Sequence, residues 1–121
     1  MHPQVLRWEA QGSHPVATGG HHNLSTSAST IVQIIGRGQT GQDGCWQFPL
    51  TSVDSIELPP EPEHTIAIIA TPLEIGAVDF HPNPVYLVAK VRHANIGIWS
   101  FTSEGQPAAL VQFTWQCSFI H

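Results

Sequence analysis

The sequence predicts an all-β fold, an antiparallel β-sandwich or small barrel with an extended N-terminal arm. The 121 residues contain 11 Ile, 9 Val and 9 Thr, whose branched Cβ atoms pack well on a pleated sheet. Apolar and polar residues alternate at period two in the C-terminal third. Gly, Pro and Asn turn signals separate these segments at intervals of about 8 to 12 residues, which is typical of sandwiches and barrels.

The chain length favours one domain, or one domain with an arm. We expect residues 1–29 to form the arm and residues 30–121 to form the β domain. Residues 11–23 are polar and Gly-rich, and residues 24–30 are rich in Ser and Thr. Such a segment buries too little apolar area alone to offset its ordering entropy. We therefore expect the arm to lie on its own domain or on a neighbouring subunit, with residues 5–9 as a short strand at a sheet edge.

The first half of the domain is predicted to consist of short strands. These are residues 30–35, 45–50, 53–58 and 64–71. The first should end at the glycines of residues 36–38, and the second at Pro49. Residues 59–62 contain three prolines and predict a stiff, extended linker. Residues 64–71 are apolar on both faces, which is typical of a central strand covered on both sides.

The second half carries the clearest alternation. The predicted elements are a possible strand at 75–80, strands at 85–92 and 98–102, turns at 95–97 and 103–107, and a long strand at 109–120. In the last of these, six apolar residues recur at every second position. This period predicts a strand with one buried face, on which Trp115 is a core residue.

The charge balance excludes several classes of function. Charged residues make up 11% of the chain, against about 25% in a typical domain. Four basic and nine acidic residues give a net charge of −5, which argues against nucleic-acid binding.

No apolar run approaches the roughly 20 residues of a membrane-spanning helix. The N-terminal residues lack a basic segment followed by an apolar one, so we expect no export signal.

Two cysteines, Cys45 and Cys117, allow two interpretations. A disulfide between them would close a loop of about 70 residues and stabilise the domain by roughly 4 kcal/mol. Alternatively, both are buried free thiols, which are ordinary core residues. The second interpretation is favoured because no export signal points to an oxidising compartment.

Metal-binding and catalytic chemistry have weak support in the sequence. Asp79 and His81 would share a strand face and could bind a metal together with His64 or His93. Nothing in their spacing requires this, so we expect solvated or hydrogen-bonded histidines and no metal or cofactor. There is no nucleophile elbow and no glycine-rich phosphate loop. We therefore predict that the protein is not an enzyme and has no catalytic residues.

Aromatic side chains are the remaining candidates for recognition. Trp8, Tyr86 and Trp99 are the residues that we expect to contact a partner or ligand. A solvent-facing Trp or Tyr suits stacking on a sugar ring or the centre of a protein interface.

The segment from Phe48 to the end resembles the small β-sandwich of H-type lectins and of phage tail-fibre tips. The similar features are the Phe48-Pro49 step, the Pro-rich linker, and the strands at 64–71, 85–92 and 111–115 joined through Trp99-Ser100-Phe101. The resemblance implies a trimer-forming sandwich. Residues 94–97 stand where the family carries a Thr-Gly-Phe turn, so no sugar-binding residue is transferred.

Together, these features predict a non-enzymatic structural or interaction protein of a virion, such as a phage decoration, fibre, capsid or tail component made in the host cytoplasm. We expect a homo-oligomer, preferably a trimer, that contacts other virion proteins through its β domain and arm. The alternative is a carbohydrate-binding module similar to an H-type lectin, which would bind a cell-surface glycan in a cytoplasmic or extracellular setting. The third hypothesis is a small enzyme or a metal protein.

Overall fold

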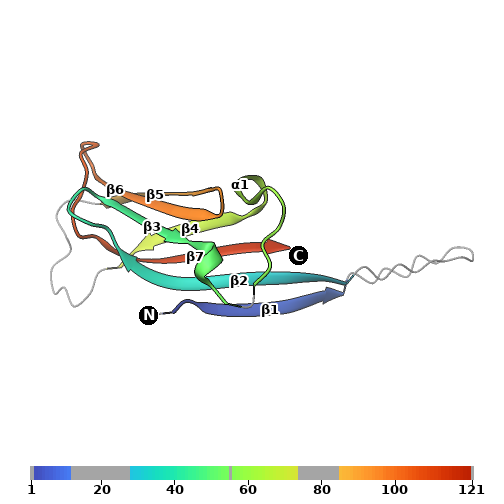
Figure 1. Cartoon of the computed structure of the whole chain (residues 1–121). Helices are drawn as coiled ribbons and strands as arrows, with labels where there is room; N and C mark the ends of the chain where they lie inside the picture. Colours follow the sequence, from blue (N-terminus) through green and yellow to red (C-terminus); the bar gives the residue numbers. More distant parts are fainter. Residues whose placement is uncertain (1, 12–27, 55, 74–84, 121) are drawn as a thin grey trace, which may run out of the picture.

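The computed structural model describes residues 2–11, 28–54, 56–73 and 85–120, and it confirms the all-β fold (Figure 1). The strands are β1 (Gln4–Gln11), β2 (Ala28–Gln39), β3 (Cys45–Pro49), β4 (Ala67–Pro72), β5 (Val85–Arg92), β6 (Asn95–Thr102) and β7 (Gln112–Ile120). They form a four-stranded sheet in the order β1-β2-β7-β4 and a three-stranded sheet in the order β3-β6-β5. Every pairing within the sheets is antiparallel. The described strands form two sheets and no closed barrel, so the fold is a sandwich.

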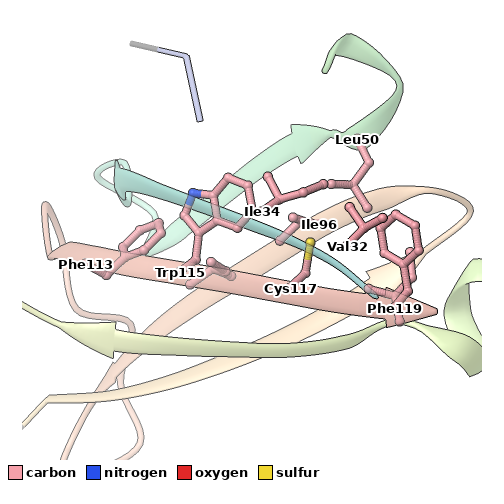
Figure 2. Close-up of a cluster of buried hydrophobic side chains, with 10 residues drawn as sticks. Val32, Ile34, Leu50, Ile96, Phe113, Trp115, Cys117 and Phe119 are labelled. Carbon is pink, nitrogen blue, oxygen red and sulfur yellow. The ribbon is translucent and has the colours of Figure 1, made fainter. Parts of the chain in front are cut away.

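The core lies between the two sheets and is centred on β7. Phe113, Trp115, Cys117 and Phe119 are all buried on one side of this strand, as the predicted alternation requires (Figure 2). The other buried side chains of the core come from β2 in the same sheet, from β6 in the opposite sheet and from the connections: Val32, Ile34, Leu50, Ile66, Ile96 and Ile98. Trp115 is therefore a core residue, as predicted.

Strand β2 is longer than predicted because it continues through both of its glycines. Gly36 pairs with Trp115, and Gly38 pairs with Phe113 on β7. A Cβ atom at Gly36 would lie 2.6 Å from two carbons of the Trp115 ring. The absence of a side chain admits the aromatic rings of β7 beneath the strand, so these glycines mark close packing and not a turn. The prediction that the strand ends at residues 36–38 is wrong.

The first strand belongs to the chain's own sheet. β1 pairs with β2 over its whole length, from Gln4 opposite Ile35 to Gln11 opposite Ala28. Val5 packs against the core. The predicted short strand at a sheet edge is therefore confirmed. We expected the arm to lie on its own domain or on a neighbouring subunit, and this part of it lies on its own domain. Residues 12–27 of the arm lie outside the described residues.

The connection between β3 and β4 departs from prediction. Residues 53–58 are not a strand in their described part, since a short 3₁₀ helix, η1 (Leu50–Ser52), precedes them and turns the chain. The linker at 59–62 is not extended throughout, because Glu61 is left-handed at φ 52° and starts the helix α1 (Pro62–Thr65). A proline is compatible with the first helical position, where no backbone donor is needed. Neither described helix has the length or apolar composition needed to cross a bilayer.

The apolar strand predicted at 64–71 is shifted and lies at an edge. β4 begins at Ala67, after α1, and pairs only with β7 among the described strands. Ile69 on its outward side is 58% exposed. The prediction of a central strand covered on both sides is therefore wrong, because one of its apolar faces lies outside the sandwich.

The C-terminal strands agree with prediction apart from their ends. β5 has the predicted range, and its alternate residues are partly buried and exposed. The hairpin turn after it is made by His93 and Ala94, at φ 49° and 66°, and not by residues 95–97. Two left-handed residues make the primed turn whose twist matches that of a hairpin. The last strand begins at Gln112, because Leu110 is left-handed at φ 57°. The possible strand at 75–80 lies outside the described residues.

Candidate interaction surfaces

The outward side of each sheet carries apolar side chains. Six large hydrophobic residues are exposed in the described part of the chain, and only Leu110 lies in a loop. Trp8, Ile69 and Ile120 lie on the four-stranded sheet, whereas Tyr86 and Val88 lie on the three-stranded sheet. An antiparallel sheet with one solvated side ordinarily carries polar residues there. Both outer sides therefore differ from ordinary solvated surfaces.

The strand register defines the first surface, which we call the four-strand face. Its members alternate with the residues that point to the core: Gln4, Leu6, Trp8, Ile31, Gln33, Ile35, Arg37, Ala67, Ile69, Thr71, Thr114, Gln116, Ser118 and Ile120. Trp8 is opposite Ile31, which is opposite Ile120, so these three side chains form one row across three strands. A second row contains Ile35 and Ile69 on either side of Gln116.

The four-strand face is almost free of charge. Arg37 is the one charged member among the residues that define it. A hollow of about 170 Å³ also lies here, lined by Ile35, Ile69, Thr71, Thr114, Trp115 and Gln116. The chain as a whole carries a charge of −5, yet no carboxylate belongs to this face. Its composition is that of a neutral, mixed aliphatic and amide surface.

We call the outward side of the other sheet the three-strand face. It consists of Cys45, Gln47, Tyr86, Val88, Lys90, Arg92, Asn95, Gly97, Trp99 and Phe101. Tyr86 is opposite Phe101, and Val88 is opposite Trp99. Directly opposite and diagonal side chains on one face of an antiparallel pair are within reach of aromatic rings. Three aromatic residues therefore gather at one end of this face.

Of the three predicted contact residues, two are brought together. Tyr86 and Trp99 are diagonal neighbours on the three-strand face. Trp8 belongs to the other sheet and lies on the four-strand face. Phe101 was not predicted as a contact residue. Its position two residues after Trp99 on the same strand is the signal that could have identified it.

A buried pair of hydroxyl groups lies at one end of the sandwich and is structural. Ser100 Oγ lies 2.6 Å from the Ala108 carbonyl oxygen and 2.9 Å from Thr40 Oγ1. Thr40 Oγ1 also accepts a 2.9 Å bond from the backbone N–H of Val111. Because each hydroxyl carries one proton, the network is satisfied when Thr40 donates to Ser100 and Ser100 donates to Ala108. The pair thus holds two loops against β6.

The histidines of the described chain show no metal site. His64 and His93 are both exposed, and no group of three His, Cys, Asp or Glu residues in the described ranges could hold an ion. Asp79 and His81, the other members of the suggested cluster, lie outside the described residues.

The two cysteines are free thiols, so the disulfide alternative is wrong. Cys117 is buried in the core, whereas Cys45 is only partly buried and pairs with Trp99 on the three-strand face. The expectation that both thiols are buried is therefore correct for Cys117 alone. The two cysteines lie on opposite sides of the three-stranded sheet. Burial raises the pKa of the Cys117 thiol from 9.0 to about 12.

We expect the two thiols to differ sharply in alkylation by iodoacetamide at pH 8. Cys45 should react in the folded protein, and Cys117 should react only after unfolding, because the thiolate is the nucleophile. The raised pKa also predicts that stability falls as the pH rises from about 9 towards 12, since the unfolded chain loses this proton first. Mass spectrometry of the native and urea-unfolded protein measures the first effect. Equal labelling of both thiols in the folded state would contradict the burial of Cys117.

Comparisons with known proteins add no relative to this description. No family model matches the chain, and no match was found among curated proteins or solved structures.

Proposed function

We propose that the chain is a non-enzymatic structural or interaction protein that assembles as a homo-oligomer through the four-strand face. The observation that supports this proposal is the apolar, nearly uncharged outer side of the sheet. Trp8, Ile69 and Ile120 are 47%, 58% and 65% exposed there. Covering this surface removes apolar area from water, which is the main driving force of association.

A second copy of the chain is the partner that we propose for this face. A partner with charged residues at the contact would lose their hydration without finding opposite charges. In a second copy, the residues that define the four-strand face include no charged side chain apart from Arg37. Two chains of charge −5 repel each other at long range, but carboxylates are absent from the contact itself. The resemblance to H-type lectins and tail-fibre tips favours a trimer.

The setting that we propose is a virus particle, as a decoration, fibre or other capsid or tail component. With only 11% charged residues, the chain suits a subunit whose surface is largely covered by neighbours. Assembly through the four-strand face would leave the rest of the subunit's surface available to other virion proteins. Each contact would stabilise the folded subunit by mass action.

The assembly proposal is tested by the native mass of Ile69→Lys. We expect the unaltered chain to have a native mass of at least twice the 13.2 kDa of one chain, and the variant to shift towards 13.2 kDa. The physical reason is that a lysine at this position would be desolvated without a partner. Multi-angle light scattering measures both masses at several concentrations.

Leu110→Lys is the matched control. Leu110 is 50% exposed but lies in a loop outside the four-strand face, so this change should leave the mass unaltered. A native mass of 13.2 kDa for the unaltered chain at all concentrations would refute the proposal. Deletion of residues 1–29 is a less specific test, because it also removes β1 from the sheet.

A second candidate function is carbohydrate binding at the three-strand face. The observation that favours it is the group of Tyr86, Trp99 and Phe101 on one outward surface, with Tyr86 55% exposed. Aromatic rings with an accessible face suit the apolar side of a sugar ring, and their polar atoms can hydrogen-bond to hydroxyl groups. This candidate does not compete with assembly, because it uses the opposite side of the sandwich.

A further inference from the structure

The indole ring of Trp99 lies next to the backbone of Gly97 on the three-strand face. Gly97 lies two residues before Trp99, so a side chain at this position would be on the same side of β6 as the indole. A Cβ atom at Gly97 would lie only 2.5 Å from the Cη2 atom of Trp99 and 2.9 Å from Cζ3. The six-membered ring therefore occupies the space above the glycine backbone, and Gly97 is buried although it belongs to an outward-facing position. Trp99 is partly buried in this position, so part of its side chain stays open to solvent on the three-strand face.

Polar groups flank the glycine that supports this ring. Gly97 is opposite Gln47 on β3 and opposite Lys90 on β5. Both side chains are exposed. An amide and an ammonium group thus stand on the two strands beside the one that carries the ring. They are placed to hydrogen-bond to the edge of a molecule stacked on the indole.

The charge of the three-strand face has one sign. Lys90 and Arg92 are both exposed on it, and they are two of the four basic residues in the chain. None of the residues that define this face carries a carboxylate. Acidic residues near these strands in the described sequence lie on the connections instead, such as Asp43 before β3 and Glu104 after β6. A face with two cations and no anion is complementary to a ligand of negative charge.

We infer that the three-strand face is a binding site for acidic saccharides, with Trp99 as the stacking platform and Lys90 and Arg92 as partners of the sugar's carboxylate or sulfate. This inference rests on the second candidate function and names its ligand class. A sugar ring supplies an apolar side for the indole and hydroxyl groups for Gln47. Its acidic group supplies a negative charge opposite the two cations.

A single-stranded nucleic acid also combines rings with negative charge, but it fits the face less well. Such ligands are ordinarily held by an extended basic groove together with stacked bases. Here the chain carries a net charge of −5, and the face offers two cations. One localised acidic group is therefore a better match than a continuous phosphate backbone.

The test is isothermal titration of the full chain with uronic-acid tetrasaccharides and with their methyl esters, which keep the sugar rings but lose the charge. We expect the acidic forms to bind about tenfold more tightly than the esters, and the difference to shrink as salt is added. A single-stranded oligothymidine of eight nucleotides is the probe for the competing ligand class.

Variants locate the site. Trp99→Ala should weaken binding of acidic and esterified sugars alike by about tenfold or more, as expected for a central contact. Lys90→Gln should weaken only the acidic forms. Gly97→Ala should also weaken both, because the added Cβ displaces the ring while Trp99 remains. Leu110→Ala, in a loop outside both faces, is the matched control and should not change binding.

The outcomes separate the inference from the candidate function. Equal binding of acids and esters would overturn the acidic specificity and leave carbohydrate binding intact. No binding of any sugar would overturn both, without affecting the assembly proposal. Tighter binding of the oligothymidine, or unchanged binding by Trp99→Ala, would overturn the inference. Circular dichroism spectra of all variants show whether a loss of binding reflects a loss of fold.

Discussion

Replacing Trp115 with alanine is expected to destabilise the domain by about 3 to 5 kcal/mol. Trp115 is 2% exposed, and its ring contacts both Trp46 and Phe48 of the opposite sheet, with centroids 6.0 and 5.5 Å away. The truncation would leave a cavity where the two sheets meet. Urea unfolding followed by intrinsic fluorescence measures the change in the free energy of unfolding.

Trp115→Phe separates the packing of this residue from its polar atom. The indole Nε1 is buried without a hydrogen-bond partner among the described residues. A phenylalanine ring keeps part of the packing that the alanine variant loses. It also removes the unpaired indole donor, whose burial is costly. We expect the phenylalanine variant to lose at least about 1 kcal/mol less than the alanine variant. An alanine variant with an unchanged unfolding curve would show that the register of β7 is misassigned.

Replacing Gly36 with alanine is expected to cost about 1 to 3 kcal/mol, although alanine is ordinarily better than glycine inside a strand. The new methyl group would lie within 2.8 Å of three atoms of the Trp115 ring. Because that ring is enclosed by Trp46 and Phe48, it cannot move aside freely. Thermal and urea unfolding both measure this loss.

The double variant Gly36→Ala with Trp115→Phe tests whether the loss comes from this contact. A smaller ring provides space for the methyl group, so the two changes together should cost less than the sum of their separate effects. Additive effects would show that glycine is required for another reason. Gln33→Ala, at an outward-facing position of the same strand, is the control and should change stability by less than about 0.5 kcal/mol.

The candidate surfaces were predictable only in part. The alternation of β5 and the positions of Tyr86 and Trp99 in the sequence mark both residues as possible contacts. Their adjacency was not predictable, because it depends on the register between β5 and β6, and that register depends on a turn at His93 and Ala94. Histidine is among the residues enriched at left-handed positions, but alanine is not, and the Asn95-Ile96-Gly97 segment is the stronger turn signal, so the turn was misplaced by two residues. The apolar four-strand face was missed because the arm and the last strand are distant in sequence.

The sequence by itself determined the all-β class, the burial of Phe113, Trp115, Cys117 and Phe119 on one side of the last strand, and the outward row of β5. These features follow from local alternation, because side chains of a strand point to opposite sides in turn. Only the tertiary structure decided that Gly36 lies within a strand, that β4 is an edge strand and that β1 joins its own sheet. Each of these depends on which distant strand lies alongside and how large its side chains are, which a local pattern does not encode.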